Sequence, residues 1–209
     1  MELLFVLSLL CGALALLSLS ALHVVSPEFQ PSWHMISEYA LGKYKILITS
    51  FFLLWGASSI FLALALWNSM NTTWATIGLV LLLVSAVGEI MGGLFDVKHK
   101  LHGFSFLLGV PSLPIAAMLI GYQLIEQANW ADNSSLLLFA SHATWISLVI
   151  MGIAMVVMMS GFKKSGIPMG PDVPPPQSVP PGVIALAGYA NRLLVICYVG
   201  WLMMVVVSG

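Results

Sequence analysis

Charged side chains are scarce in this chain, and their scarcity excludes a soluble domain. Lysine, arginine, aspartate and glutamate make up 7% of the 209 residues, whereas hydrophobic residues make up 60%. Soluble domains carry about 25% charged residues, because their surfaces must be hydrated. The apolar surface of this chain must instead face lipid. The net charge of −1 also leaves no basic surface for nucleic acid, so we expect no nucleic-acid partner.

Cysteine is nearly absent as well. The two cysteines, Cys11 and Cys197, lie inside apolar runs, which favours two small packed side chains over a disulfide framework. A signal peptide is not expected either, because residue 2 is a glutamate rather than a base and the first apolar run continues to about Val25. We interpret this run as a retained first helix that is long enough to cross a bilayer.

Long apolar runs dominate the rest of the sequence. Each is close to or above the ~20 residues that a membrane-spanning helix needs. The strands of a membrane barrel would instead be short and alternating. The sequence therefore predicts an all-α fold, a single six-transmembrane-helix bundle over residues 1–209, with helices at about 3–25, 46–67, 74–95, 103–125, 135–161 and 183–207.

The basic residues predict the orientation of this bundle. Six of the seven lysines and arginines lie in the first, third and fifth connections, and the second and fourth connections have none. By the positive-inside rule the odd connections are cytoplasmic and both termini lie outside. We expect a cell inner membrane as the location. The fifth connection, residues 162–182, is rich in proline and is interpreted as an extended cytoplasmic linker.

Two ionisable residues fall inside predicted helices, where an unpaired charge is costly. Glu89 lies about seven residues before the end of the third helix, with Asp96 at i+7 on the same helical face. Arg192 lies in the last helix near the same side of the membrane, and a buried arginine favours a carboxylate partner. We predict that Arg192 pairs with Glu89 or Asp96. The alternative is that Arg192 extends to the interface without a partner.

A second polar group is built on histidine. Asp96, His99 and His102 follow one another at i, i+3 and i+6, a spacing that brings side chains together on a helix or tight turn. His34 and Glu38 lie in the first connection, on the same predicted side of the membrane. These residue types ligate zinc or iron, which makes a divalent metal at Asp96, His99 and His102 one hypothesis. Acid–base chemistry is another. A hydrogen-bonded loop without chemistry is the interpretation that we favour.

The two remaining histidines predict no haem site. His142 lies in the outer half of the fifth helix and is expected to be a packed core histidine. His23 lies at the other membrane end, as an interfacial side chain, too far from His142 to share an iron.

Three segments resemble the prokaryotic membrane proteins catalogued as domain of unknown function 998. They are the stretch from Trp33 to Gly42, the stretch from Gly93 to Asp96 followed by His99 and His102, and the pair Asn191-Arg192. The proline-rich connection has no counterpart in that pattern. The resemblance implies a six-helix bundle and no particular reaction. It also implies a polar cluster that comprises Ser37, Glu38, Asp96, His99, His102, Asn191 and Arg192.

We therefore expect a polar pocket on the cytoplasmic side, with Pro111 and Pro114 bending the fourth helix to open space for it. Such a pocket suits a lipid head group or an isoprenoid-like amphiphile. The favoured function is a lipid-binding protein or an accessory subunit, with membrane lipids and other membrane subunits as partners. The alternatives are an intramembrane metal-dependent enzyme acting on a lipid and a small transporter, so enzymatic activity stays open. The expected pocket residues are His34, Ser37, Glu38, Glu89, Asp96, His99, His102, Asn191 and Arg192.

Overall fold

The computed structural model of the chain describes residues 2–167, 176 and 178–209. These residues form helices and connecting turns, with no strand among them. Six of the helices are long and apolar enough to cross a membrane, which confirms the predicted all-α membrane fold. They are α1 (Glu2–Val25), α2 (Lys45–Leu66), α3 (Thr73–Leu94), α4 (His102–Leu124), α6 (Ser134–Lys164) and α7 (Ala187–Ser208).

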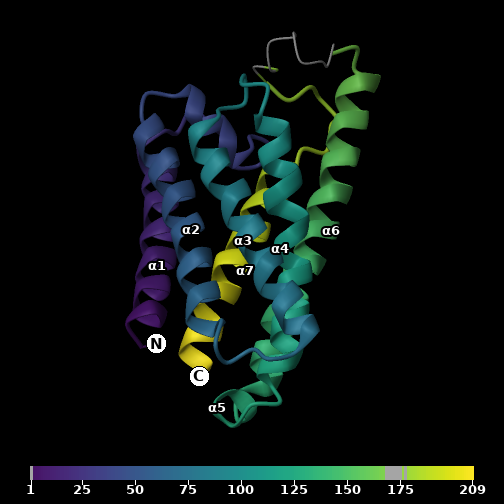
Figure 1. Cartoon of the computed structure of the whole chain (residues 1–209). Helices are drawn as coiled ribbons and strands as arrows, with labels where there is room; N and C mark the ends of the chain where they lie inside the picture. The colour runs from purple at the N-terminus through teal and green to yellow at the C-terminus, as the bar shows by residue number, and fades with distance from the viewer. Residues whose placement is uncertain (1, 168–175, 177) are drawn as a thin grey trace.

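The six long helices form a closed ring (Figure 1). Each of them packs against the next along the chain, and α7 closes the ring against α1. Because α7 also contacts α2 and α4, its large side chains Tyr198 and Trp201 are fully buried. Both chain termini lie at the end of the ring where α5 is found, opposite the end that carries the first, third and fifth connections (Figure 1).

Several helix boundaries differ from the sequence prediction. The helix α6 continues to Lys164, since Lys163 and Lys164 in its last turn interact favourably with the negative end of the helix dipole. The helix α7 begins at Ala187 rather than at 183, because Val183 packs in a non-helical segment against α6 at Gly161. Part of the predicted proline-rich linker, residues 168–175 and 177, lies outside the described residues.

Two short helices lie in connections for which the sequence predicted no helix. A 3₁₀ helix, η1 (Ile36–Leu41), lies in the first connection, and α5 (Ala128–Ala131) lies in the fourth. Both bury aromatic side chains, Tyr39 in η1 and Trp130 in α5. The indole N–H of Trp130 donates to the Val205 carbonyl oxygen at 2.9 Å, which fixes α5 to the end of α7. Tertiary packing therefore orders segments whose own sequences carry no periodicity.

The two prolines of α4 remain inside a continuous helix. Proline has no backbone N–H, so Pro114 leaves the carbonyl oxygen of Val110 without its helical donor. The hydroxyl of Tyr198 on α7 donates to that oxygen at 2.7 Å. The side chain of one helix thus replaces the backbone bond that the other helix lacks, as membrane helices with internal proline require.

The tightest helix contact joins α3 and α4. A Cβ atom added to Gly88 would lie 2.6 Å from Gly109 Cα and 2.7 Å from the Ser105 carbonyl oxygen, so only glycine fits there. Small residues allow membrane helices to approach until their backbones touch. This contact places Glu89, the next residue of α3, against the cavity described below.

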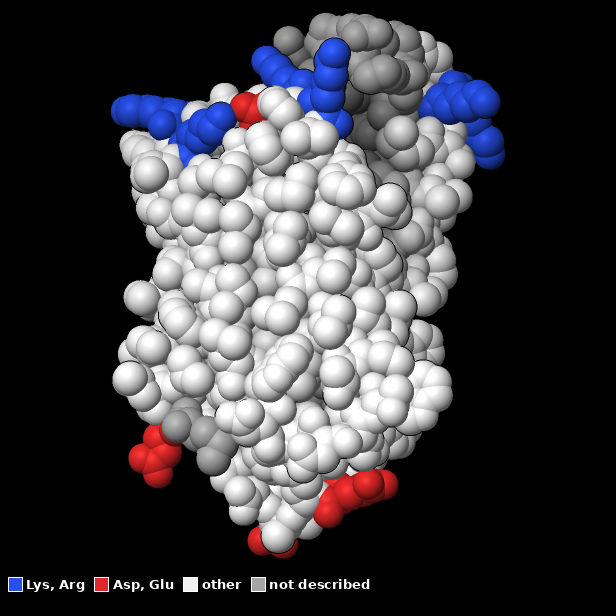
Figure 2. Space-filling model, viewed as in Figure 1, with Lys and Arg blue, Asp and Glu red and all other residues white. Residues whose placement is uncertain are grey.

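Basic side chains lie at one end of the molecule, with an acidic side chain among them, and acidic side chains alone mark the other end in this view (Figure 2). The six lysines lie in or beside the first, third and fifth connections, and the basic side chains gather at that end. Acidic side chains mark the other end, where Glu2, Glu126 and Asp132 are exposed. The surface between the ends is free of charge in this view, as a lipid-facing belt requires (Figure 2).

Candidate functional site

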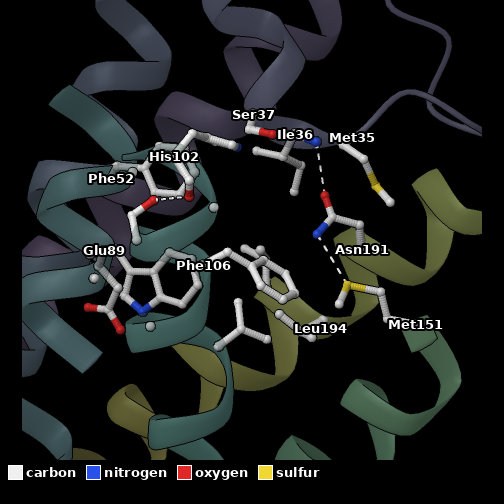
Figure 3. A pocket seen from close by; sticks show the side chains of 18 of the residues that line it. Met35, Ile36, Ser37, Phe52, Glu89, His102, Phe106, Met151, Asn191 and Leu194 are labelled. Carbon is white, nitrogen blue, oxygen red and sulfur yellow. Dashed lines mark hydrogen bonds between the residues drawn. The ribbon is translucent and has the colours of Figure 1, made fainter. Parts of the chain in front are cut away.

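A cavity of about 320 Å³ lies inside the ring, near η1 and the start of α4. Side chains of α2, α3, α4, α6 and α7 form its walls, and residues at the start of η1 close one end. The walls are mostly apolar, with Phe52, Phe106, Met151, Met155 and Leu194 among them (Figure 3). We refer to this space as the cavity.

Polar groups gather at the η1 end of the cavity, where Figure 3 shows Ser37, His102 and Asn191 on the same side of Phe106 and Leu194. The Asn191 side-chain oxygen accepts the Ile36 N–H at 2.9 Å, which ties η1 to α7. The Asn191 side-chain nitrogen has only the Met151 sulfur as a partner, at 3.5 Å, and a thioether is a weak acceptor. This end therefore retains hydrogen-bonding capacity for a ligand.

The ring of His102 faces the same end of the cavity. Its Nδ1 lies 2.9 Å from the carbonyl oxygen of Phe95. Because a carbonyl only accepts, this contact assigns the hydrogen to Nδ1 and leaves Nε2 as an acceptor in the neutral ring. A ligand hydroxyl or amide at this end would find both a donor, Asn191, and an acceptor, His102.

Glu89 lies deeper, with 3% of its surface exposed. The Ser59 hydroxyl donates to Oε2 at 2.8 Å, and the Ser85 hydroxyl lies 2.8 Å from Oε1. Within the described part of the chain the one ion pair joins Lys45 and Asp96, so Glu89 is held by neutral hydroxyl groups. The carboxyl group is thereby fixed in the wall of the cavity inside the membrane-spanning part of α3.

The predicted pairing of Arg192 with Glu89 or Asp96 is wrong. The guanidinium donates from Nε to His23 Nε2 at 2.6 Å and from Nη2 to the Tyr39 hydroxyl at 3.1 Å. Its Nη1 donates to the carbonyl oxygens of His34 and Gly188, at 2.8 and 3.0 Å. With 8% of its surface exposed, Arg192 does not extend to the interface either. The first connection folds over the end of the bundle and supplies two of these acceptors, the His34 carbonyl oxygen and the Tyr39 hydroxyl. The sequence prediction considered only carboxylate partners on other helices.

His23 was expected to be interfacial, and it contacts this arginine directly. Its Nδ1 lies 2.7 Å from the Leu19 carbonyl oxygen, so Nδ1 carries the hydrogen and Nε2 accepts from Arg192. The first helix, the first connection and the last helix are thus joined through one guanidinium group. We call His23, His34, Glu38, Tyr39 and Arg192 the arginine cluster.

Two buried polar atoms of the arginine cluster lack partners, His34 Nδ1 and Glu38 Oε2. Burial raises the pKa of Glu38 to about 7, and this shift is opposed by a backbone hydrogen bond from Met35 and by the charge of Arg192. Burial also lowers the pKa of His34, with the Arg192 charge adding to the effect and a backbone hydrogen bond with Gln30 opposing it. Both residues lie outside the membrane-spanning helices, where protons from water are accessible.

The stability of the protein should therefore depend on pH through Glu38. The folded state retains a proton up to about pH 7, whereas an unfolded glutamate releases it near pH 4.3. Stability that is present at pH 4 is thus lost as the pH rises to 7, by an amount on the order of 1–2 kcal/mol for a partly exposed group. We expect the melting temperature in detergent to fall less between pH 5 and pH 8 in Glu38→Gln than in the wild type. Glu28→Gln, at an exposed site in the same connection, should show the same dependence of melting temperature on pH as the wild type. If Glu38→Gln also shows the wild-type dependence, Glu38 is not the group responsible.

The predicted convergence of Asp96, His99 and His102 is not observed. Asp96 accepts from Lys45 Nζ at 2.9 Å, and this hydrogen bond lowers the pKa of Asp96. His99 is exposed and accepts the Leu101 N–H, while His102 lines the cavity. Residues 96–101 form turns rather than a helix, so the i, i+3, i+6 spacing does not align the side chains. Among the described residues no group of three or more His, Cys, Asp or Glu side chains is suited to a metal ion.

The sequence of the chain matches one known protein family. The model of the family described as "protein of unknown function (DUF998)" matches residues 9–208. The chain belongs to this family. No curated protein and no solved structure matches it. The matched range includes every residue that lines the cavity.

The nine residues that sequence analysis assigned to one pocket divide into three places in this DUF998 fold. Ser37, Glu89, His102 and Asn191 line the cavity. His34, Glu38 and Arg192 belong to the arginine cluster. Asp96 and His99 lie in the third connection, between α3 and α4, and do not line the cavity. Sequence reasoning missed Ser59, Ser85 and Trp55. Of these, Ser85 was accessible from the sequence, because it precedes Glu89 by four residues in an apolar helix.

Proposed function

We propose that this protein binds one amphiphilic lipid in the cavity. The observation that carries the proposal is the shape and chemistry of that space: about 320 Å³ within a membrane-spanning bundle, with apolar walls and polar side chains at one end. Small-molecule sites range from roughly 300 to 1,000 Å³ and combine apolar walls with a few polar groups. The volume suits a single chain, with the head group at Ser37, His102 and Asn191.

The orientation that we propose places the polar end of the cavity toward the cytoplasm. The lysine-bearing connections lie at this end, and the positive-inside rule assigns such connections to the cytoplasmic side. Exposed lysines there, such as Lys98 and Lys100, are suited to anionic lipid head groups. Labelling of a lone cysteine at position 98 by an impermeant reagent on intact cells would contradict this orientation.

A cavity-filling substitution tests lipid binding. Gly103 lines the cavity at an exposed position of α4, and a Cβ atom added there meets nothing within 4 Å. We expect Gly103→Leu to occupy space that the lipid needs, because a leucine side chain fills a volume otherwise open to the ligand. Native mass spectrometry of the protein extracted from membranes should show a bound lipid on the wild type and its loss from the variant.

The matched control is Gly152→Leu on α6. This glycine is exposed in the lipid-facing belt, and its added Cβ also meets nothing within 4 Å. It should retain the lipid as the wild type does. A wild type without bound lipid, or two variants that retain lipid equally, would refute the proposed function.

A further inference from the structure

We infer that the bound lipid carries a free hydroxyl group, which binds deep in the cavity between Trp55 and Glu89. This inference rests on the proposed function and specifies the chemical class of its ligand. It concerns the part of the cavity away from the head-group residues, where two polar side chains of α2 and α3 lie among apolar walls.

Trp55 supplies the first observation. Its side chain lines the cavity and is 4% exposed, yet its indole Nε1 is buried without a hydrogen-bond partner among the described residues. Buried N–H groups are nearly always paired in folded proteins, because an unpaired donor costs about 1–3 kcal/mol. The other buried tryptophans of the bundle follow that rule: Trp130 donates to Val205 and Trp201 donates to Ser141. Trp55 thus retains a donor for a group that enters the cavity.

Glu89 supplies the second observation. Each of its carboxyl oxygens is engaged by one serine hydroxyl, Ser59 at Oε2 and Ser85 at Oε1. A carboxylate offers about four acceptor positions, so acceptor capacity remains after these two bonds. Because the serines fix the carboxyl group, it is preorganised to accept from a ligand without rearranging.

A hydroxyl group matches this pair of side chains. It accepts a hydrogen bond through its oxygen and donates one through its hydrogen, so a single group can use both the Trp55 donor and the Glu89 acceptor. An ester or ether oxygen accepts only, and an ammonium group donates only. Neither would satisfy both residues.

The depth of the pair specifies where on the lipid the hydroxyl lies. The Ser85 hydroxyl contacts both Glu89 and the Gly109 carbonyl oxygen, which places Glu89 at the level of Gly109 on α4. Gly109 follows His102 by seven residues, a rise of about 10 Å at 1.5 Å per residue. The hydroxyl therefore belongs beneath the head group, as the free glycerol hydroxyl of a lysophospholipid lies beneath its phosphate and terminal group. A diacyl lipid has esterified this position and needs more space than a cavity of about 320 Å³.

The ligand class is thus a lysophospholipid, with one acyl chain and a free glycerol hydroxyl. The probes are 1-oleoyl lysophosphatidylcholine, its 2-deoxy analogue and 1-monooleoylglycerol, each titrated into the full chain in detergent. We expect the wild type to bind the hydroxyl-bearing lysolipid roughly tenfold more tightly than the deoxy analogue. Monooleoylglycerol should bind more weakly than the lysolipid, because its glycerol is its head group and cannot occupy both ends of the site; tighter binding of monooleoylglycerol would contradict the depth assigned to the hydroxyl.

The decisive variant is Trp55→Phe, which removes the N–H and keeps an aromatic ring. It should weaken the hydroxyl-bearing lysolipid roughly tenfold and leave the deoxy analogue unchanged. The smaller ring also leaves space beside Phe51 and Tyr198, so some loss of melting temperature without ligand is expected; the comparison of the hydroxyl and deoxy lysolipids isolates the contribution of the N–H. Trp74→Phe, at a site that is 65% exposed, should leave both affinities unchanged.

Two results would overturn the inference. Equal affinity of the wild type for the hydroxyl and deoxy lysolipids would refute the hydroxyl site, and so would an equal loss of both in Trp55→Phe. If Gly103→Leu still displaces the lipid in either case, the proposed function stands without this refinement. If no probe binds and the wild type retains no lipid from membranes, both fail together.

Discussion

We expect Gly88→Ala to remove most of the folded protein, since one added methyl group collides with backbone rather than with a side chain. The new Cβ would lie 2.6 Å from Gly109 Cα and 2.7 Å from the Ser105 carbonyl oxygen. Overpacking against movable side chains costs about 1–3 kcal/mol, and here α3 and α4 must separate along their whole contact, so we expect the cost to exceed that range. The yield of monodisperse protein and its melting temperature in detergent measure the effect.

Gly109, which faces Gly88 from the other side of the contact between α3 and α4, provides the control. A Cβ atom at Gly109 would lie 3.5 Å from the Glu89 nitrogen, an ordinary van der Waals distance. Gly109→Ala should therefore fold and retain a melting temperature near that of the wild type. Similar behaviour of the two variants would show that the helices do not approach as closely as the structure describes.

Arg192→Met should be nearly as damaging, for an electrostatic reason. The substitution removes four hydrogen bonds, to His23, Tyr39 and two backbone carbonyl oxygens, and leaves these acceptors without their donor. Each buried acceptor left unpaired costs about 1–3 kcal/mol. We expect a large drop in melting temperature, together with rapid hydrogen exchange or proteolysis in the first connection, because the arginine holds η1 against α7.

Arg192→Lys should recover only part of the lost stability, because an ammonium group cannot span the acceptors that the planar guanidinium reaches. The exposed Lys164→Met removes a positive charge without removing any of these contacts and should behave as the wild type. A wild-type melting temperature and intact first connection in Arg192→Met would show that the arginine cluster does not organise this end.

The fold could be predicted because composition alone restricts it. Six apolar runs in a chain with 7% charged residues leave the backbone no stable option in lipid except helices. The boundary at Ala187 could not be predicted, because Val183 is as apolar as the helix that follows and is held out of it by packing on α6. Hydropathy reports which residues avoid water, but it does not report which neighbour covers them.

The site was predicted only in part, for a related reason. Scarcity of polar residues identified Glu89, His102 and Asn191, which do line the cavity. The predicted partners of Arg192 were wrong, because it donates to the backbone carbonyl oxygens of His34 and Gly188 in place of a carboxylate, and the residue types of a sequence do not reveal backbone acceptors. Trp55 gave no sequence signal at all, since one tryptophan in an apolar helix resembles any packed aromatic side chain.

The wall between α4 and α6 has a consequence for how occupancy of the cavity must be measured. These helices meet closely at Gly121 and Ser141, while nearer η1 both line the cavity, where Phe106 is 50% exposed on a membrane-spanning helix. The lipid that we propose would enter there sideways from the acyl-chain layer, where it is already dissolved, rather than from water. Saturation would then follow the mole fraction of that lipid in the bilayer, and titrations expressed as aqueous concentration would report an affinity that changes with the amount of membrane present.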